Sequence, residues 1–101
     1  MIDVRRQTDG QVQLCVTGPM RLAELAELLE QARALAADGG SGINVDLAAA
    51  GHLHSGSLQI LRVLERQATA AGVAFSVIGA SEAARDALQL CGLGRWLEKE
   101  R

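Results

Sequence analysis

The sequence INVDL (43–47), AAAGHLH (48–54) and SGSLQILRVLERQATAA (55–71) decides the fold of this chain. In residues 43–47 apolar and polar side chains alternate, which is the pattern of a strand with one buried face. In residues 55–71 the apolar side chains recur with the period of a helix. The side expected to face the core carries Ser57, Ile60, Leu61, Leu64, Ala68 and Ala71. The stretch therefore predicts a strand, a loop and a helix that begins with hydroxyl side chains.

The opposite side of this predicted helix is polar. Its polar residues are spaced by four, three and four, which places them within about 40° of one another on a helix: Ser55, Gln59, Arg62 and Arg66. Leu58 and Val63 flank this line, and we expect both to be at least partly exposed. The line is either an ordinary solvated helix face or a surface that docks a partner.

The rest of the chain predicts further strands and helices around this unit. Asp9-Gly10 is a strong tight-turn signal, so the first two strands should form a hairpin. The expected strands are residues 2–6, 11–17, 43–47 and 73–78, and the expected helices are residues 21–37, 55–71 and 81–91. Ser81 should cap the last helix, Trp96 and Leu97 should fold back on the core, and Glu98 to Arg101 should form a charged end.

The order β-β-α-β-α-β-α predicts an α/β fold with a small mixed sheet of four main strands. Polar residues alternate with apolar ones in residues 11–17 and 43–47, so the helices should lie on one face and leave the other partly open. The buried stripe expected for the helix over residues 21–37 is Leu22, Leu25, Ala26, Leu29, Ala32 and Ala36.

The composition is that of one globular domain covering residues 1–101. Hydrophobic residues make up 49% and charged residues 22%, both ordinary values. Aromatic residues make up 2%, so stacking on bases is not expected. The chain has ten basic and twelve acidic residues, so its charge does not indicate a nucleic-acid partner either. No apolar run reaches about 18 residues, and no secretory signal is present, so we expect a cytoplasmic protein without membrane insertion. Cys15 and Cys91 form no spacing motif and should be free buried thiols.

The loop before the central helix carries three residues that could support chemistry: His52, His54 and Ser55. The histidines could bind a metal, but zinc needs three or four ligands and no third has an obvious spacing. Ser55 could be a hydrolase nucleophile, yet LHSGS (53–57) lacks the glycines of a nucleophile elbow. Ser55 could also simply cap the helix, a contribution of about 1 kcal/mol. We expect no catalytic residue, no metal and no cofactor.

Four short segments resemble the STAS domain, the fold of bacterial anti-sigma-factor antagonists: VDL (45–47), LHSGSL (53–58), VIGAS (77–81) and LCGL (90–93). In that family the turn typically reads Asp-Ser-Ser-Gly or Asp-Ser-Thr-Gly. The serine after the aspartate is phosphorylated by a partner kinase that is also an anti-sigma factor. The resemblance makes Ser55 the phosphorylated residue. Here His54 stands at the aspartate position, Gly56 at the second hydroxyl and Ser57 at the glycine.

The resemblance implies a non-enzymatic partner-switching module that binds an anti-sigma factor or a regulatory serine kinase. Its partner should contact the outward line of the central helix, at Leu58, Gln59 and Arg62, together with His54. One alternative is a constitutive STAS subunit of an ABC-type lipid transporter, which needs no phosphorylation. Another is a small hydrolase or metal-binding protein that uses His52, His54 and Ser55.

Overall fold

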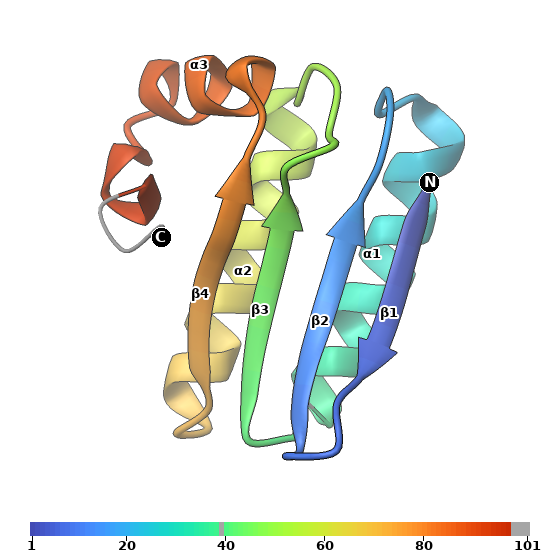
Figure 1. Cartoon of the computed structure of the whole chain (residues 1–101), viewed down its shortest axis with the longest axis vertical. Helices are drawn as coiled ribbons and strands as arrows, with labels where there is room; N and C mark the ends of the chain where they lie inside the picture. The colour runs from blue at the N-terminus through green and yellow to red at the C-terminus, as the bar shows by residue number, and fades with distance from the viewer. Residues whose placement is uncertain (39, 98–101) are drawn as a thin grey trace.

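Four strands and three α-helices follow one another in the predicted order, and a short 3₁₀-helix follows them (Figure 1). The structure is a computed structural model that describes residues 1–38 and 40–97. The predicted charged end, residues 98–101, lies outside the described residues. The elements are β1 (Ile2–Arg6), β2 (Gln11–Val16), α1 (Leu22–Ala37), β3 (Gly42–Leu47), α2 (Ser55–Ala70), β4 (Ala74–Ala80), α3 (Glu82–Leu90) and η1 (Gly94–Leu97).

The strands form one sheet in the order β1-β2-β3-β4. β1 and β2 are antiparallel, with Ile2 opposite Val16, whereas β2–β3 and β3–β4 are parallel. The turn between β1 and β2 contains Gly10 with a φ of 88°, a left-handed conformation that glycine adopts without steric cost. The predicted hairpin and the mixed sheet of four strands are confirmed.

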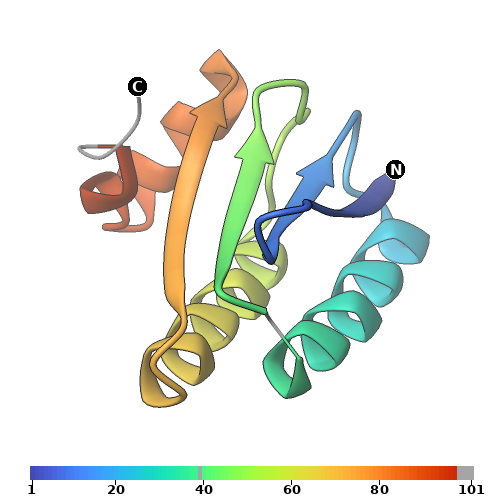
Figure 2. The ribbon, with the colours of Figure 1, turned by 60° about the horizontal axis from the view of Figure 1, so that its bottom comes forward.

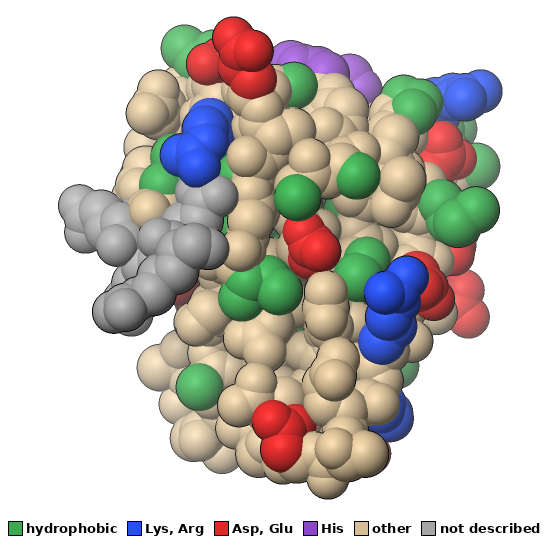
Figure 3. All heavy atoms as spheres, viewed as in Figure 1, with side chains coloured by type: hydrophobic (Ala, Val, Ile, Leu, Met, Phe, Trp, Pro, Cys, Tyr) green, Lys and Arg blue, Asp and Glu red, His purple; other side chains and the backbone are tan. Residues whose placement is uncertain are grey.

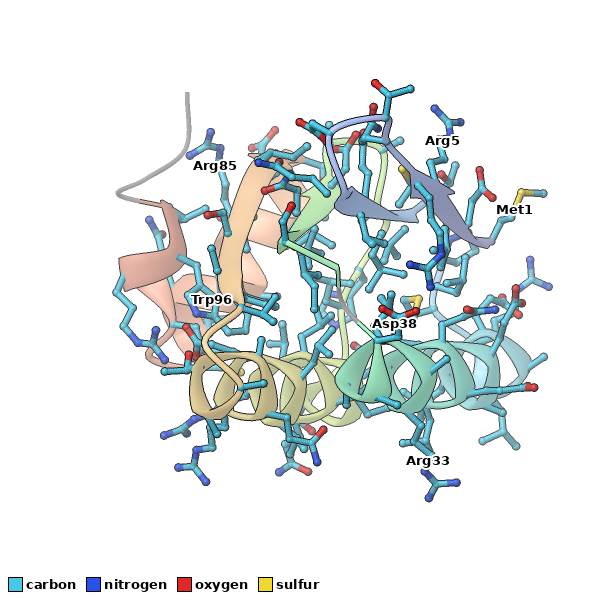
Figure 4. All side chains as sticks on the ribbon, turned by 90° about the horizontal axis from the view of Figure 1, so that it is seen from below. Met1, Arg5, Arg33, Asp38, Arg85 and Trp96 are labelled. Atoms are coloured by element: carbon cyan, nitrogen blue, oxygen red, sulfur yellow. The ribbon has the colours of Figure 1, made fainter. Side chains whose placement is uncertain are left out.

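Helices α1 and α2 lie side by side against one face of the sheet (Figures 2 and 4). The opposite face, seen in Figure 3, carries polar side chains that hydrogen-bond across the strands. Gln13 Nε2 donates to Asp46 Oδ2 at 3.3 Å, and Asn44 Nδ2 donates to Gln11 Oε1 at 2.7 Å. The alternating polarity of β2 and β3 thus separates a polar face from a helix-covered face. In the part of the chain that the structure describes, no helix has the length and apolar character needed to cross a bilayer.

Helix α3 lies at the edge of this arrangement, beside the end of β4, rather than over the middle of the sheet (Figure 1). The N–H of Ser81 donates to the carbonyl of Leu47 at 2.9 Å, which ties the start of α3 to the end of β3. Ala84, Ala87 and Leu88 are buried, so α3 closes the core at this end of the sheet.

The buried face of α1 differs from the predicted stripe. Leu22 is 82% exposed and Leu29 is 38% exposed, and Ala26 is exposed as well. Ala32 is buried as predicted and Leu25 and Ala36 are half-buried, but the other buried residues of α1 are Leu28 and Leu35, which the prediction did not include. Apolar residues occupy a wider arc of α1 than the sheet can cover, so one edge of the arc remains in solvent.

The buried face of α2 also differs in part from the prediction. It consists of Ser57, Leu58, Leu61, Leu64 and Ala68. Ile60 is half-buried and Ala71 is exposed, although both were expected to face the core. The core side of the helix is therefore rotated toward Leu58 and away from Ile60.

A cluster of Glu65, Arg95 and Trp96 fastens the C-terminal segment to α2. Both Nη atoms of Arg95 donate to the Glu65 carboxylate, at 2.8 and 2.9 Å, and Trp96 Nε1 donates to Glu65 Oε2 at 2.9 Å. The Trp96 ring is buried 5.5 Å from the Phe75 ring, and Leu97 packs against the core. The predicted return of Trp96 and Leu97 to the core is confirmed. The hydrogen bonds from Arg95 hold the pKa of the Glu65 carboxyl below its ordinary value.

Replacing Leu61 by alanine tests the packing of α2. Leu61 is fully buried, so Leu61→Ala should lower the free energy of unfolding by roughly 2–5 kcal/mol through loss of contacts and a residual cavity. Val63, two positions along the same helix, is 51% exposed, and Val63→Ala should cost less than about 0.5 kcal/mol. Urea denaturation of both variants measures the difference. Similar costs for both would show that α2 packs with another face.

Replacing Glu65 by glutamine tests the cluster with Arg95 and Trp96. Glu65→Gln removes a charge that accepts three hydrogen bonds, so it should cost about 1–3 kcal/mol at pH 7. The folded-state pKa of Glu65 is depressed, so this stabilisation is complete above about pH 4.3 and disappears as the pH falls through the folded-state pKa.

The measurement is thermal unfolding of wild type and Glu65→Gln at pH 7 and pH 3. The two proteins should differ at pH 7, and the difference should be smaller at pH 3, because protonation of Glu65 removes the charge that accepts these hydrogen bonds. Glu30 on α1 is exposed, and Glu30→Gln serves as a control that should behave as wild type at both pH values. A difference that persists unchanged at pH 3 would contradict a role for the Glu65 charge.

Candidate functional site

The candidate site lies where the parallel strands β2, β3 and β4 end, because their carboxyl ends meet at one edge of the sheet. The loops after β2 and β3 are joined there by backbone hydrogen bonds. The N–H of Gly18 donates to the carbonyl of Ala49 at 2.9 Å, and the N–H of Gly51 donates to the carbonyl of Gly18 at 2.8 Å. We call this pair of bonds the loop bridge. It fixes the path of the loop that leads into α2.

Glycine suits both sides of the loop bridge, for different reasons. Gly18 has a φ of 76°, a conformation that side chains with a Cβ rarely adopt. A Cβ on Gly51 would lie 3.1 Å from the carbonyl oxygen of Gly18 and 3.2 Å from Cα of Pro19, so a side chain there would require the loops to shift by a few tenths of an ångström. The sequence shows glycine at both positions, but no sequence pattern predicts the hydrogen bond between Gly51 and Gly18.

Ser81 holds the same loop from the other side. Its Oγ donates to the carbonyl of Ala50 at 2.7 Å and accepts the N–H of Ala84 at 3.1 Å. The predicted capping role of Ser81 is confirmed by the second bond. The first bond adds a role that the sequence did not indicate, because it connects the start of α3 to the loop before α2.

The start of α2 is organised by His54 and Ser57. His54 is the N-cap residue, with φ of −79° and ψ of 160°, and among the described residues its side chain makes no capping hydrogen bond. Ser57 is fully buried, and its Oγ donates to the carbonyl of His54 at 2.7 Å. Ser55 is the first helical residue, and its side chain is exposed. The interpretation of Ser55 as the helix cap is therefore wrong, and its hydroxyl is presented to solvent.

The predicted outward line of α2 is present with one correction. Ser55, Gln59 and Arg62 are exposed, as expected. Leu58 is 2% exposed and belongs to the core, so it cannot be an exposed contact residue beside them. Leu58 lines a small cavity together with Leu93, which follows α3 and is also buried, so this side of α2 belongs to the interior.

A cavity of about 160 Å³ lies at the junction of α2 with the turn after α3. Its lining joins the outward line to two residues that sequence reasoning did not include: Ser55, Leu58, Gln59, Arg62, Cys91 and Leu93. Cys91 is a free thiol and is exposed, which corrects its expected burial, while Cys15 is free and half-buried. No periodicity could have found Cys91 or Leu93, because they are distant from α2 in the sequence.

The histidines of the loop do not form a catalytic or metal centre within the described residues. The His52 and His54 rings are perpendicular, with centroids 5.2 Å apart, and both residues are exposed. Across residues 1–38 and 40–97, no group of three or more His, Cys, Asp or Glu side chains is placed to hold a metal ion. The hydrogen bonds of the same residues include none between Ser55 Oγ and an imidazole, so Ser55 has no adjacent base.

Comparison with known proteins assigns the family. Residues 4–99 match the family model described as "Mlab, STAS domain", and the chain therefore belongs to the STAS family. No curated protein matches the sequence. The expected STAS resemblance and the α/β fold class are confirmed.

Several solved structures share this fold. The unphosphorylated anti-sigma factor antagonist SpoIIAA is 15% identical with a TM-score of 0.81, over 95% of this chain and 84% of that one. The phosphorylated form of SpoIIAA, a Bacillus cell fate determinant, is 14% identical with a TM-score of 0.76, over 95% and 87%. An anti-sigma factor antagonist from Mycobacterium paratuberculosis is 24% identical with a TM-score of 0.77, over 94% and 80%. At these identities the likeness establishes the fold.

Paired serine variants test the assignment of the helix start. Ser57→Ala removes a buried hydrogen bond to the His54 carbonyl and should lower the free energy of unfolding by about 0.5–1.5 kcal/mol. Ser55→Ala changes an exposed side chain and should move stability by less than about 0.5 kcal/mol. Chemical denaturation of both variants measures the two free energies of unfolding. A larger loss for Ser55→Ala would restore Ser55 as the cap.

Proposed function

We propose that this chain is a non-enzymatic partner-switching module of the cytoplasm, acting as a single domain and resembling an anti-sigma-factor antagonist. Its partner is an anti-sigma factor or a regulatory serine kinase, which binds Ser55, Gln59 and Arg62 together with His54. Phosphorylation of Ser55 by that partner controls the association. This protein supplies no catalytic group, because the kinase brings the nucleotide and this chain is its substrate.

The observation that carries the proposal is the position of Ser55. It is an exposed hydroxyl at the first residue of α2, whereas Ser57 two positions later is fully buried. The loop bridge and Ser81 hold the preceding loop, so Ser55 is presented by a fixed backbone. A kinase can reach this serine without unfolding the helix. SpoIIAA, which shares this fold, has been solved in phosphorylated and unphosphorylated forms, which supports a phosphorylation switch in this chain as well.

The chemistry of the switch follows from the cavity beside α2. A phosphate on Ser55 adds about two negative charges and bulk to a cavity that Arg62 also lines. The phosphate would compete for Arg62 with any acidic group of the partner and would repel that group directly. The first turn of a helix tolerates an anion, so we expect the fold to persist after phosphorylation. The charge of the docking surface would change from positive to negative.

One feature of the turn supports a second candidate. The family's aspartate position is occupied by His54, and its second hydroxyl position by Gly56. A chain that had lost phosphorylation would be under no constraint to keep these groups. The second candidate is a constitutive STAS subunit of an ABC-type lipid transporter, in which the same helix face binds a partner permanently.

Four variants separate the two candidates when binding to the isolated native partner is measured by calorimetry. Arg62→Glu should weaken binding about tenfold or more, equivalent to about 1.4 kcal/mol, because it reverses the charge of the docking line. Ser55→Asp should weaken binding similarly if the phosphate switch operates, whereas Ser55→Ala should bind as wild type. Arg5→Glu, on the open face of the sheet, is the control for a general charge effect.

Intact-mass analysis with the partner and ATP completes the test. One phosphate on wild type and none on Ser55→Ala is the expected result. Binding without phosphorylation, together with wild-type affinity of Ser55→Asp, would favour the constitutive subunit. Wild-type affinity of Arg62→Glu would show that the outward line of α2 is not the docking surface.

A further inference from the structure

The exposed apolar edge of α1 continues into an apolar part of α2. Leu22 and Leu29 on α1 are 82% and 38% exposed, and Val63 on α2 is 51% exposed. They make up three of the six large hydrophobic side chains that are exposed among the described residues. Ile60 beside them is half-buried. Neither the core nor the proposed serine switch accounts for this concentration on one face.

A groove of about 390 Å³ runs between the two helices at this face. Its lining is mainly aliphatic, with glutamine and arginine at the margins: Leu29, Ala32, Arg33, Gly56, Gln59, Ile60, Val63, Leu64 and Gln67. Both helices have 16 residues, so at about 1.5 Å per residue each is about 24 Å long. The groove lining on α2 runs from Gly56 to Gln67, which is about 17 Å of helix at about 1.5 Å per residue, the length of about three turns of a docked helix.

The charged residue that lines the groove is basic, although Glu30 is exposed one turn before it on α1. Arg33 is the charged residue of the groove lining, and Figure 4 shows its side chain pointing away from the sheet on the free side of the helix layer. Arg62 and Arg66 are exposed on α2. Glu65, the acidic residue between them, is already held by Arg95 and Trp96. The part of α2 next to the groove thus presents cations without a free local counter-charge among the described residues.

We propose that the groove between α1 and α2 docks an amphipathic helix of a protein partner, with acidic side chains flanking its apolar stripe. The apolar stripe covers Leu29, Ile60 and Val63, and the acidic flanks meet Arg33 and Arg66. The inference rests on the proposed function in that it requires a protein partner, but it does not require phosphorylation of Ser55.

Charge complementarity favours this occupant over two others. A second copy of this chain bound through the same groove about a two-fold axis would bring the Arg33 and Arg66 side chains of both copies toward each other. A membrane surface is met best by protruding apolar side chains, whereas Leu29 and Ile60 line a concave groove. An acidic helix satisfies both the apolar lining and the cations.

Photo-crosslinking in the native cell tests the proposal. The full chain is expressed with p-benzoylphenylalanine in place of Val63 in the groove or, separately, in place of Arg62 on the outward line. Mass spectrometry then maps the peptide joined to each position. The expected product at position 63 contains apolar residues at helical spacing, flanked by Asp or Glu. A crosslink to a second copy of this chain, to lipid or to a segment without acidic flanks would overturn the proposal.

Charge reversal gives a second, quantitative readout. Arg33→Glu should lower the crosslink yield at position 63 by about tenfold, and added salt should lower it further. Arg5→Glu carries the same charge change on the opposite face and should leave the yield unchanged. Equal yields for the two variants would overturn the proposal. Thermal unfolding of both variants verifies that they are folded.

The two crosslinker positions distinguish failure of the groove from failure of the proposed function. A product at position 62 without one at position 63 would leave a partner on the outward line and remove the groove as its docking site. No product at either position would remove both the groove and the proposed partner-binding function of α2.

Discussion

The loop bridge is the constraint on which the functional end of the molecule depends. Two backbone hydrogen bonds, from Gly18 to Ala49 and from Gly51 to Gly18, bind the loop after β2 to the loop after β3. They form an isolated parallel β-bridge between Gly18 and Ala50, which satisfies polar backbone groups beyond the ends of the strands. Ser81 adds a third attachment through the carbonyl of Ala50. Because His54 and Ser55 follow this loop directly, the direction of α2 and the exposure of its first serine depend on these bonds.

Much of the fold could be predicted from the sequence because its local signals agree with one another. Alternating polarity in β2 and β3 identified the strands and the open face, and Asp9-Gly10 identified the hairpin. These patterns are encoded by neighbouring residues, so no knowledge of the tertiary structure was needed. The exposure of Ser55, Gln59 and Arg62 was predictable for the same reason, because those residues lie opposite the centre of the buried face.

The errors in the predicted buried faces of α1 and α2 have a common physical cause. A helical projection shows which arc of a helix is apolar, but it does not show how much of that arc other elements cover. Leu58 lies at the margin of the apolar arc of α2, and it is buried in the same core cluster and beside the same small cavity as Leu93, which follows α3. Leu22, Ala26 and Leu29 lie at the margin of a similar arc on α1, and nothing among the described residues covers them fully. The same kind of residue therefore becomes core in one helix and surface in the other, according to elements distant in the sequence.

Gln59 connects the two candidate surfaces of α2. It lines both the small cavity beside Ser55 and the groove shared with α1. Ser55 and Gln59 are about one helical turn apart on α2. A phosphate on Ser55 would thus lie about one turn from a partner helix that contacts Gln59 in the groove. Charge added at Ser55 could then act on an acidic partner through direct repulsion, which needs no rearrangement of the fold. In this arrangement the signal is the change of surface charge. The backbone held by the loop bridge only has to keep the cavity beside Ser55 and the groove in fixed positions relative to each other.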